Sequence, residues 1–249
     1  ISDTVGEPAD VADLLTNHIN LIYHPTLMAL AGDSAVASLR QVYEEGNYIL
    51  VVEGGVPTAF NGYCCVAYSF DGQEVTFEEA VQTYAGRAAH LVCVGTCASW
   101  GGIPKAGSNP TGIKGVSELL GQTTINVSGC PANPMWVVKA IVKLLLGQNV
   151  PLDEHGRPVE LYEAFGNIHD SCPRWQDGNN KATELAQDGK CLWDLGCRGP
   201  LTKANCYRNW NGIAGMGQWC IGVNAPCHGC TEPSFPGPES FYELYSPDA

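Results

Sequence analysis

Cysteine is concentrated in the last third of this 249-residue chain. Seven of its twelve cysteines lie in the last 80 residues, behind one histidine, and the set is His169, Cys172, Cys191, Cys197, Cys206, Cys220, Cys227 and Cys230. Eight such ligands are enough for two complete four-ligand sites. Thiolate is the ligand that iron–sulfur clusters require, and a histidine can replace one cysteine in them. The spacing therefore predicts a carrier of several redox clusters.

Two further cysteines, Cys97 and Cys130, each follow an apolar run and are expected in glycine-rich turns. In open parallel α/β sheets, sites form at the carboxyl ends of the strands, so the two thiolates should lie together. Two cysteines make half a cluster, and the site would need two more ligands. On this evidence alone, a pair of structural, half-buried thiols is the alternative.

Disulfides and zinc are the competing uses of so many cysteines. Disulfide-dense scaffolds are usually short chains that cannot build a core, whereas the first half of this chain has an ordinary α/β pattern. Structural zinc would fit the pair Cys227 and Cys230 if that pair stood alone. His228, between them, is expected at the surface or beside a site. Cys64, Cys65 and Cys93 are expected to be buried apolar thiols.

The composition indicates an ordered globular protein, with 45% hydrophobic and 16% charged residues. A net charge of −13 argues against nucleic acid and anionic membrane surfaces as partners, and fits either solubility or docking of a basic redox partner. No apolar run approaches the roughly 20 residues of a membrane span. No signal peptide is visible, and because the chain opens at Ile1 without Met, we expect processing or missing residues upstream.

The first 150 residues alternate between strand-like and helix-like segments. Apolar strands are predicted at 48–53, 90–95 and 123–128, and helices at 77–89 and 134–146, the second opened by a proline and followed by a glycine. Near-continuous apolar strands separated by helices predict a parallel sheet covered on both faces.

The pattern changes after residue 150. Periodic segments become few, and four of the six tryptophans lie here among the cysteines, at Trp175, Trp193, Trp210 and Trp219. Such a segment would take much of its folding energy from metal sites. The tryptophans would either form a partly dry shell around these sites or serve as ordinary core residues. We therefore predict an α/β domain over 1–150 and a largely irregular cluster-binding domain over 151–249.

Five segments in register carry a family resemblance. They are Tyr23-His-Pro-Thr-Leu-Met-Ala29, Val52-Glu-Gly-Gly-Val-Pro-Thr-Ala59, Gly95-Thr-Cys-Ala-Ser-Trp-Gly-Gly102, Ser128-Gly-Cys-Pro-Ala-Asn-Pro134 and Cys227-His-Gly-Cys-Thr-Glu-Pro-Ser-Phe235. Over nearly its whole length the chain resembles the small, electron-transferring subunit of nickel–iron hydrogenases. The resemblance implies a flavodoxin-like first domain, an irregular second one, and three iron–sulfur clusters leading away from a nickel–iron centre in a separate large subunit.

The same resemblance implies the ligand sets. The proximal cluster would be held by Cys97 and Cys130, and the distal one by His169, Cys172, Cys191 and Cys197. The medial cluster would be held by Cys206, Cys220, Cys227 and Cys230. Family members often have proline at the position of Cys220 and a 3Fe–4S cluster, so we expect 4Fe–4S here and in all three clusters, with a lowered medial potential.

Two positions depart from the family pattern. The proximal Cys-x-x-Cys of the family lies before the point aligned with Ile1, so we expect the two missing ligands upstream, with Cys64, Cys65 and Cys93 as possible substitutes. Oxygen-tolerant members carry an extra cysteine five residues after the one matching Cys97. Because this chain has Gly102 there, a modified proximal cluster is not expected.

The implied function is relay of electrons between a hydrogen-activating centre in an obligate large subunit and an external carrier, such as a cytochrome or a quinone-linked partner. The chain lacks the paired Cys-x-x-Cys motifs of the large subunit, so it is not the catalytic chain. The alternatives are an iron–sulfur carrier or subunit of another redox enzyme, and a zinc-stabilised interaction module. A periplasmic or partner-mediated membrane location is favoured over the cytoplasm.

Overall fold

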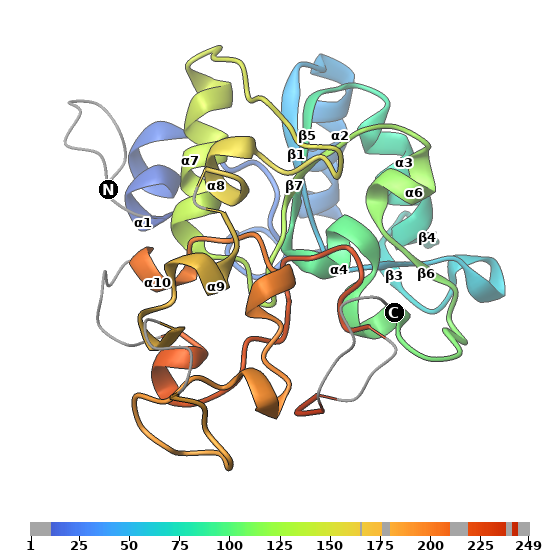
Figure 1. Ribbon diagram of the computed structural model, residues 1–249. Coiled ribbons are helices and arrows are strands. Elements are labelled where there is room, and N and C mark those ends of the chain that lie inside the picture. The colour runs from blue at the N-terminus through green and yellow to red at the C-terminus, as the bar shows by residue number, and fades with distance from the viewer. Residues whose placement is uncertain (1–10, 165, 176–179, 210–218, 238–240, 244–249) are drawn as a thin grey trace.

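A three-stranded parallel sheet lies at the centre of the computed structural model (Figure 1), which describes residues 11–164, 166–175, 180–209, 219–237 and 241–243. Its order is β1 (Tyr48–Glu53), β5 (Ala88–Val94) and β7 (Ile125–Val127). Glu53 pairs with Val94, and Val94 pairs with Val127, so all three strands end at one edge. The predicted parallel sheet is confirmed, and the segments that carry Cys97 and Cys130 leave it side by side.

Helices cover both faces of this sheet, because alternate residues of a strand point to opposite sides. On one face Leu91 and Cys93 pack with residues of α3 (Phe77–Ala85) and α6 (Val116–Leu120). On the other, Val92 and Val127 pack against α7 (Pro134–Leu145). Figure 1 shows α7 and α8 on one side of the strands and α3 and α6 on the other.

Local sequence signals account for the ends of the two longer crossover helices. Thr76 and Glu79 form a capping box at the start of α3, and Asn133 accepts a hydrogen bond from the Met135 N–H at the start of α7. The expectation that the first helix continues to residue 89 is wrong. Helix α3 ends at Ala85, Gly86 follows it, and β5 already begins at Ala88.

The remaining described elements are short, except for the 14-residue helix α2 (Gly32–Glu45). The strands are β2 (Val56–Pro57), which pairs with β6 (Ile113–Lys114), and the hairpin of β3 (Val66–Phe70) and β4 (Gln73–Thr76). The helices before residue 151 are α1 (Val11–Asp13), the π-helix η1 (Leu14–His18), α2 (Gly32–Glu45), η2 (Ala59–Gly62), α4 (Gly95–Trp100) and α5 (Gly102–Lys105). After it the described helices are α8 (Val159–Tyr162), α9 (Ile168–Ser171), η3 (Pro173–Trp175), η4 (Trp193–Leu195), η5 (Gly199–Leu201), α10 (Cys206–Asn209) and η7 (Ile221–Val223).

The largest hydrophobic cluster contains residues from both sides of residue 150. Val127 and Trp136 belong to it together with Tyr162, Leu192 and Trp219. Several cysteines are also part of it, namely Cys172, Cys197 and Cys227, with Cys206 packed against it. Sulfur atoms of the candidate ligands are therefore core atoms of this molecule.

A buried ion-pair network also joins the two parts of the chain. The Arg157 side chain, 1% exposed, donates from Nε to Asp153 Oδ2 at 2.7 Å and from Nη1 to Glu232 Oε2 at 3.0 Å. Nη1 also donates to the carbonyl oxygen of Thr231 at 3.1 Å. A buried charge is tolerated when it is paired and hydrogen-bonded in this way. The loop after α7 is thereby fixed to the segment that follows Cys230.

Over the described ranges, no helix combines the length and the hydropathy needed to cross a bilayer.

Candidate iron–sulfur cluster sites

Cys97 and Cys130 lie at neighbouring strand ends, as predicted. Helix α4 follows β5 without a break, so Cys97 lies in a short helix and the expected glycine-rich turn is wrong there; Cys130 does lie in a turn after β7. The Thr96 N–H donates to Gly129 O at 3.0 Å, and the Gly129 N–H donates to Thr96 Oγ1 at 2.9 Å. Burial is the largest cause that raises the pKa of Cys97, and the nearby Cys130 thiolate raises it further. The two sulfurs are thus neighbours, with Cys130 exposed.

Gly102 lies directly against the Cys97 sulfur. Its backbone φ is +54°, and a Cβ added there would stand 3.0 Å from Cys97 Sγ. Because both the backbone and the space favour glycine, a side chain at this position would press on the sulfur. Nothing at this position of the chain can act as an additional ligand.

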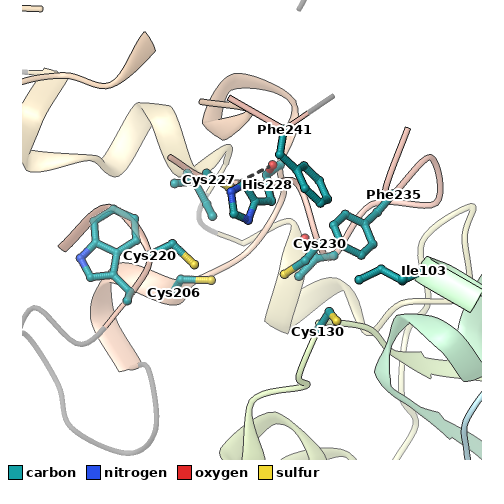
Figure 2. A pocket seen from close by; sticks show the side chains of 13 residues that line it. Ile103, Cys130, Cys206, Cys220, Cys227, His228, Cys230, Phe235 and Phe241 are labelled. Carbon is teal, nitrogen blue, oxygen red and sulfur yellow. Dashed lines mark hydrogen bonds between the residues drawn. The ribbon is translucent and has the colours of Figure 1, made fainter. Parts of the chain in front are cut away.

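The four predicted medial ligands surround one cavity of about 170 Å³ (Figure 2). Cys206 begins α10, Cys220 precedes η7, and Cys227 and Cys230 lie on the loop that follows. The rest of the lining is largely apolar and includes Ile103, Ile168, Trp219, Phe235 and Phe241. The four cysteines that the family resemblance groups together therefore line one cavity.

Burial raises the pKa of each of these thiols. For Cys206 the pKa lies well above the ordinary range because of burial first and the Cys230, Cys227 and Cys220 thiolates next. Burial raises the pKa of Cys230 to about 11, although the backbone N–H of Cys130 donates to its sulfur and opposes the rise. Thiolates in this dry space need cations to replace their protons, which is what iron supplies when it binds. Cys130 also lines this cavity, so five cysteines surround a largely apolar space that fits an iron–sulfur cluster.

Three of the predicted distal ligands are neighbours as well. Burial raises the pKa of Cys197 to about 11, and Cys172 and Cys191 add to the rise. The Cys227 N–H donates to Cys197 Sγ at 3.4 Å, so a medial loop contacts a distal sulfur. A Cβ on Gly199 would lie 3.5 Å from both Cys197 Sγ and the backbone nitrogen of His169, which places these two residues together.

The His169 ring packs against two tryptophans. Its centroid lies 4.2 Å from that of Trp175 and 5.1 Å from that of Trp193, and the two tryptophan rings stack at 5.9 Å. Burial lowers the pKa of His169, which favours the neutral imidazole that a metal needs. Two of the four tryptophans predicted to lie among the ligands therefore do so here. Trp219 lines the medial cavity and also belongs to the core cluster, and Trp210 lies outside the described residues.

Within the described part of the chain, no three His, Cys, Asp or Glu side chains converge closely enough to share one metal ion. A single zinc ion would need four ligands within about 2.3 Å of one point.

The remaining cysteines and His228 differ in burial and in position. Cys93 is buried in β5, as expected, and its pKa is raised by burial to about 12. The expectation of burial is wrong for Cys64 and Cys65, which are exposed between η2 and β3, outside any strand or helix. His228 lines the medial cavity, consistent with a place beside a site.

Sequence reasoning missed the polar residues that join the sites. Thr96 Oγ1 donates to the carbonyl oxygen of Cys230, and Ser128 Oγ donates to that of Thr231 at 2.9 Å. Tyr162 in turn donates to the carbonyl oxygen of Ser128 at 2.7 Å. The only local signal is a hydroxyl residue close to a predicted ligand, at Thr96 and Ser128.

Comparison with known proteins decides the family. Residues 5–144 match the family model for the NADH ubiquinone oxidoreductase 20 Kd subunit, and residues 165–243 match that for the C-terminal part of the NiFe/NiFeSe hydrogenase small subunit. The periplasmic NiFe hydrogenase small subunit of Solidesulfovibrio fructosivorans is 39% identical over 229 residues, which cover 89% of this chain and 70% of that relative. The chain belongs to the nickel–iron hydrogenase small subunits.

Further relatives agree. The periplasmic NiFeSe hydrogenase small subunit of Desulfomicrobium baculatum is 39% identical over 256 residues, covering 93% of this chain and 79% of the relative. The solved NiFeSe hydrogenase of Desulfovibrio vulgaris Hildenborough superposes with a TM-score of 0.85 at 36% identity, over 94% of this chain and 88% of that one. This small subunit is therefore the electron-transfer part of a hydrogenase, an oxidoreductase that acts on H2 together with a large subunit.

Proposed function

We propose that this small subunit holds three 4Fe–4S clusters and passes electrons singly between the H2-activating centre of the large subunit and an external carrier. The supporting observation is that the ligand sets are joined in series. Thr96 Oγ1 donates to the carbonyl oxygen of Cys230 and accepts from the N–H of Gly129, the neighbour of Cys130, and the Cys227 N–H donates to the Cys197 sulfur at 3.4 Å. Each predicted set is thus joined to the next by hydrogen bonds.

The proposed ligands follow this series. Cys97 and Cys130 hold half of the proximal cluster. The medial set is Cys206, Cys220, Cys227 and Cys230, and the distal set is His169, Cys172, Cys191 and Cys197. When bound, each cluster accepts or gives one electron. The chain's own residues fix the spacing, exclude water and donate hydrogen bonds to sulfur.

We also propose the finer features that the family implies. The α/β part is flavodoxin-like, and residues 151–249 form the cluster-binding domain, supported by three parallel strands in one part and only short helices in the described residues of the other. A cytochrome or quinone-linked protein accepts the electrons. A periplasmic location, direct or through membrane partners, is supported by the periplasmic relatives.

The relay is tested by electron paramagnetic resonance (EPR) of the purified large–small complex during stepwise reduction. We expect three cluster signals with separate midpoint potentials, and visible absorbance that bleaches under H2. A colourless complex, or one with fewer cluster signals, would contradict the proposal.

The medial cluster type is tested by Cys220→Pro. Removing one thiolate leaves one iron without a protein ligand, so the oxidised variant should show a 3Fe–4S signal that the parent lacks. Cys64→Ser, at an exposed thiol outside the cavity, is the control and should resemble the parent. If Cys220→Pro also resembles the parent, Cys220 is not a ligand.

A further inference from the structure

His228 has a buried nitrogen with no partner among the described residues. The residue lies between Cys227 and Cys230, and its ring lines the same cavity as the four medial thiols (Figure 2). Its Nε2 is inaccessible to solvent and hydrogen-bonds to no described residue. The imidazole ring packs against two aromatic rings, with its centroid 4.7 Å from that of Phe241 and 5.3 Å from that of Tyr242, and these contacts fix its position. Buried polar atoms normally have a partner, so this one needs an explanation.

The lining of the cavity limits what that partner can be. Apart from His228, its polar side chains are the cysteines and two threonines. Both threonine hydroxyls already donate elsewhere, Thr202 to Arg198 O at 2.6 Å and Thr231 to Lys203 O at 3.1 Å. Neither hydroxyl is a hydrogen-bond partner of His228 Nε2, so the acceptor available inside the cavity is sulfur. An imidazole N–H is a hydrogen-bond donor, and thiolates and sulfides accept such bonds.

We propose that His228 donates a hydrogen bond from Nε2 to a sulfur of the medial cluster and thereby sets its reduction potential. The inference rests on the proposed function, since it requires a cluster within the four medial cysteines. No covalent bond changes in this role. The cluster takes one electron from its reduced neighbour and passes one electron on, while the imidazole keeps its proton.

This donor has a clear electrostatic consequence. A hydrogen bond to sulfur stabilises the more negative, reduced state of a cluster and so raises its potential. The fourth thiolate, Cys220, adds negative charge and lowers the potential. His228 and Cys220 therefore shift the medial reduction potential in opposite directions. The hydrogen bond offsets the effect of the thiolate that replaces the proline of other members, so that the medial cluster can still take part in electron transfer.

The experiment uses the complete large–small complex and three variants. His228→Leu removes the N–H while retaining an apolar side chain, and His228→Gln restores an N–H donor at similar reach. His90→Leu is the matched control, because His90 is exposed on β5 and does not line the cavity. The readouts are the medial midpoint potential from EPR-monitored titration, and the couplings of exchangeable protons to the reduced cluster after transfer to deuterium oxide.

The inference predicts a lower medial potential and loss of one exchangeable proton coupling in His228→Leu. His228→Gln should recover both in part, and His90→Leu should change neither. An unchanged potential in His228→Leu would overturn the inference while leaving the relay intact. A new 3Fe–4S signal in that variant would also overturn it, because His228 would then be a ligand. If the parent complex itself has no medial cluster signal, the proposed function fails as well.

Discussion

His169 is the residue that distinguishes the proposed distal site from the other two. A neutral imidazole in place of a thiolate makes a cluster less negative and raises its potential. Its ring is held against Trp175 and Trp193, and Lys181 Nζ lies 5.7 Å from the Trp193 ring centroid. Imidazole also suits a partly exposed position better than a thiolate, which is readily oxidised. These properties fit the last site before an external carrier.

We predict that His169→Ala separates two activities of the complex. Isotope exchange between H2 and water needs only the metal centre of the large subunit and should remain close to that of the parent. Reduction of an acceptor dye by H2 should slow, because electrons leave through the altered distal site. His90→Ala, on the exposed part of β5, should slow neither reaction. Equal loss of both activities would indicate misassembly, and no loss of either would remove His169 from the relay.

At the scale of elements, the junction of β5 with α4 fixes the distance between the proximal and medial loops. Thr96 is 1% exposed, accepts from the Gly129 N–H and donates to the carbonyl oxygen of Cys230. One hydroxyl thus joins the loop after β7 to the loop after η7. Because electron tunnelling weakens steeply with distance, a small movement of either loop would slow the relay.

We predict that Thr96→Val destabilises this junction. The valine leaves the Gly129 N–H and the Cys230 carbonyl buried without partners, at a cost of about 1–3 kcal/mol for each group. Thr96→Ser should recover most of the loss. Stability is measured as the urea midpoint at which the complex loses its visible cluster absorbance.

Ser99→Ala provides the matched control on the same helix. Ser99 is fully buried, but its hydroxyl donates to Gly95 O within α4 at 3.0 Å and does not join the loops. Its loss should lower the urea midpoint much less than Thr96→Val does. Equal lowering by both substitutions would show that the link between the loops contributes nothing beyond the stability of α4.

Local signals in the sequence predicted the elements well and the long-range contacts poorly. Strand β1 has the predicted ends, and α7 differs by one residue, because an apolar run, a proline and a glycine mark them directly. The end of α3 was misplaced because the residues after Gly86 are also compatible with a helix. The exposure of Cys64 and Cys65 depends on tertiary packing, which no local pattern encodes.

The candidate sites also combine features that local sequence signals indicate with long-range contacts that they do not. The number and spacing of the ligands predicted two four-ligand sites in the last third of the chain, whereas the grouping of the four medial thiols came from the family resemblance. The bond from Thr96 to Cys230 spans 134 residues, and nothing in the sequence near either residue indicates it. The buried Nε2 of His228, which has no partner in the described part of the chain, is likewise visible only once the cavity and its lining are known.

For the molecule as a whole, Arg157 is the central link between the two parts of the chain. Its guanidinium contacts Asp153 and Glu232, and it lies 5.3 Å from the Tyr162 ring centroid. Glu232 Oε1 also accepts from the Lys203 N–H at 2.6 Å. The segment after Cys230 is therefore held by charge as well as by the shared hydrophobic core.

We predict that Arg157→Met lowers the stability of the complex by about 3–5 kcal/mol, because it leaves two carboxylates without their buried partner. Arg157→Lys should lose less, since the charge remains. The measurement is the urea midpoint, together with the fraction of purified complex that carries its full iron content. Arg87→Met breaks a solvent-exposed pair with Glu44 and should cost at most about 1 kcal/mol. Equal effects at the two arginines would contradict the central role of Arg157.

Some sulfur atoms belong both to the hydrophobic core and to the proposed ligand sets. These atoms determine how the protein loses its structure. When oxygen destroys a cluster, the released thiols can be oxidised to sulfinic acids, which are polar and permanent. At Cys197 or Cys227 such a group would lie inside the largest hydrophobic cluster, where the burial of a polar group is unfavourable. Chemical damage to a ligand then becomes loss of structure, because the same sulfur atom serves the site and the core.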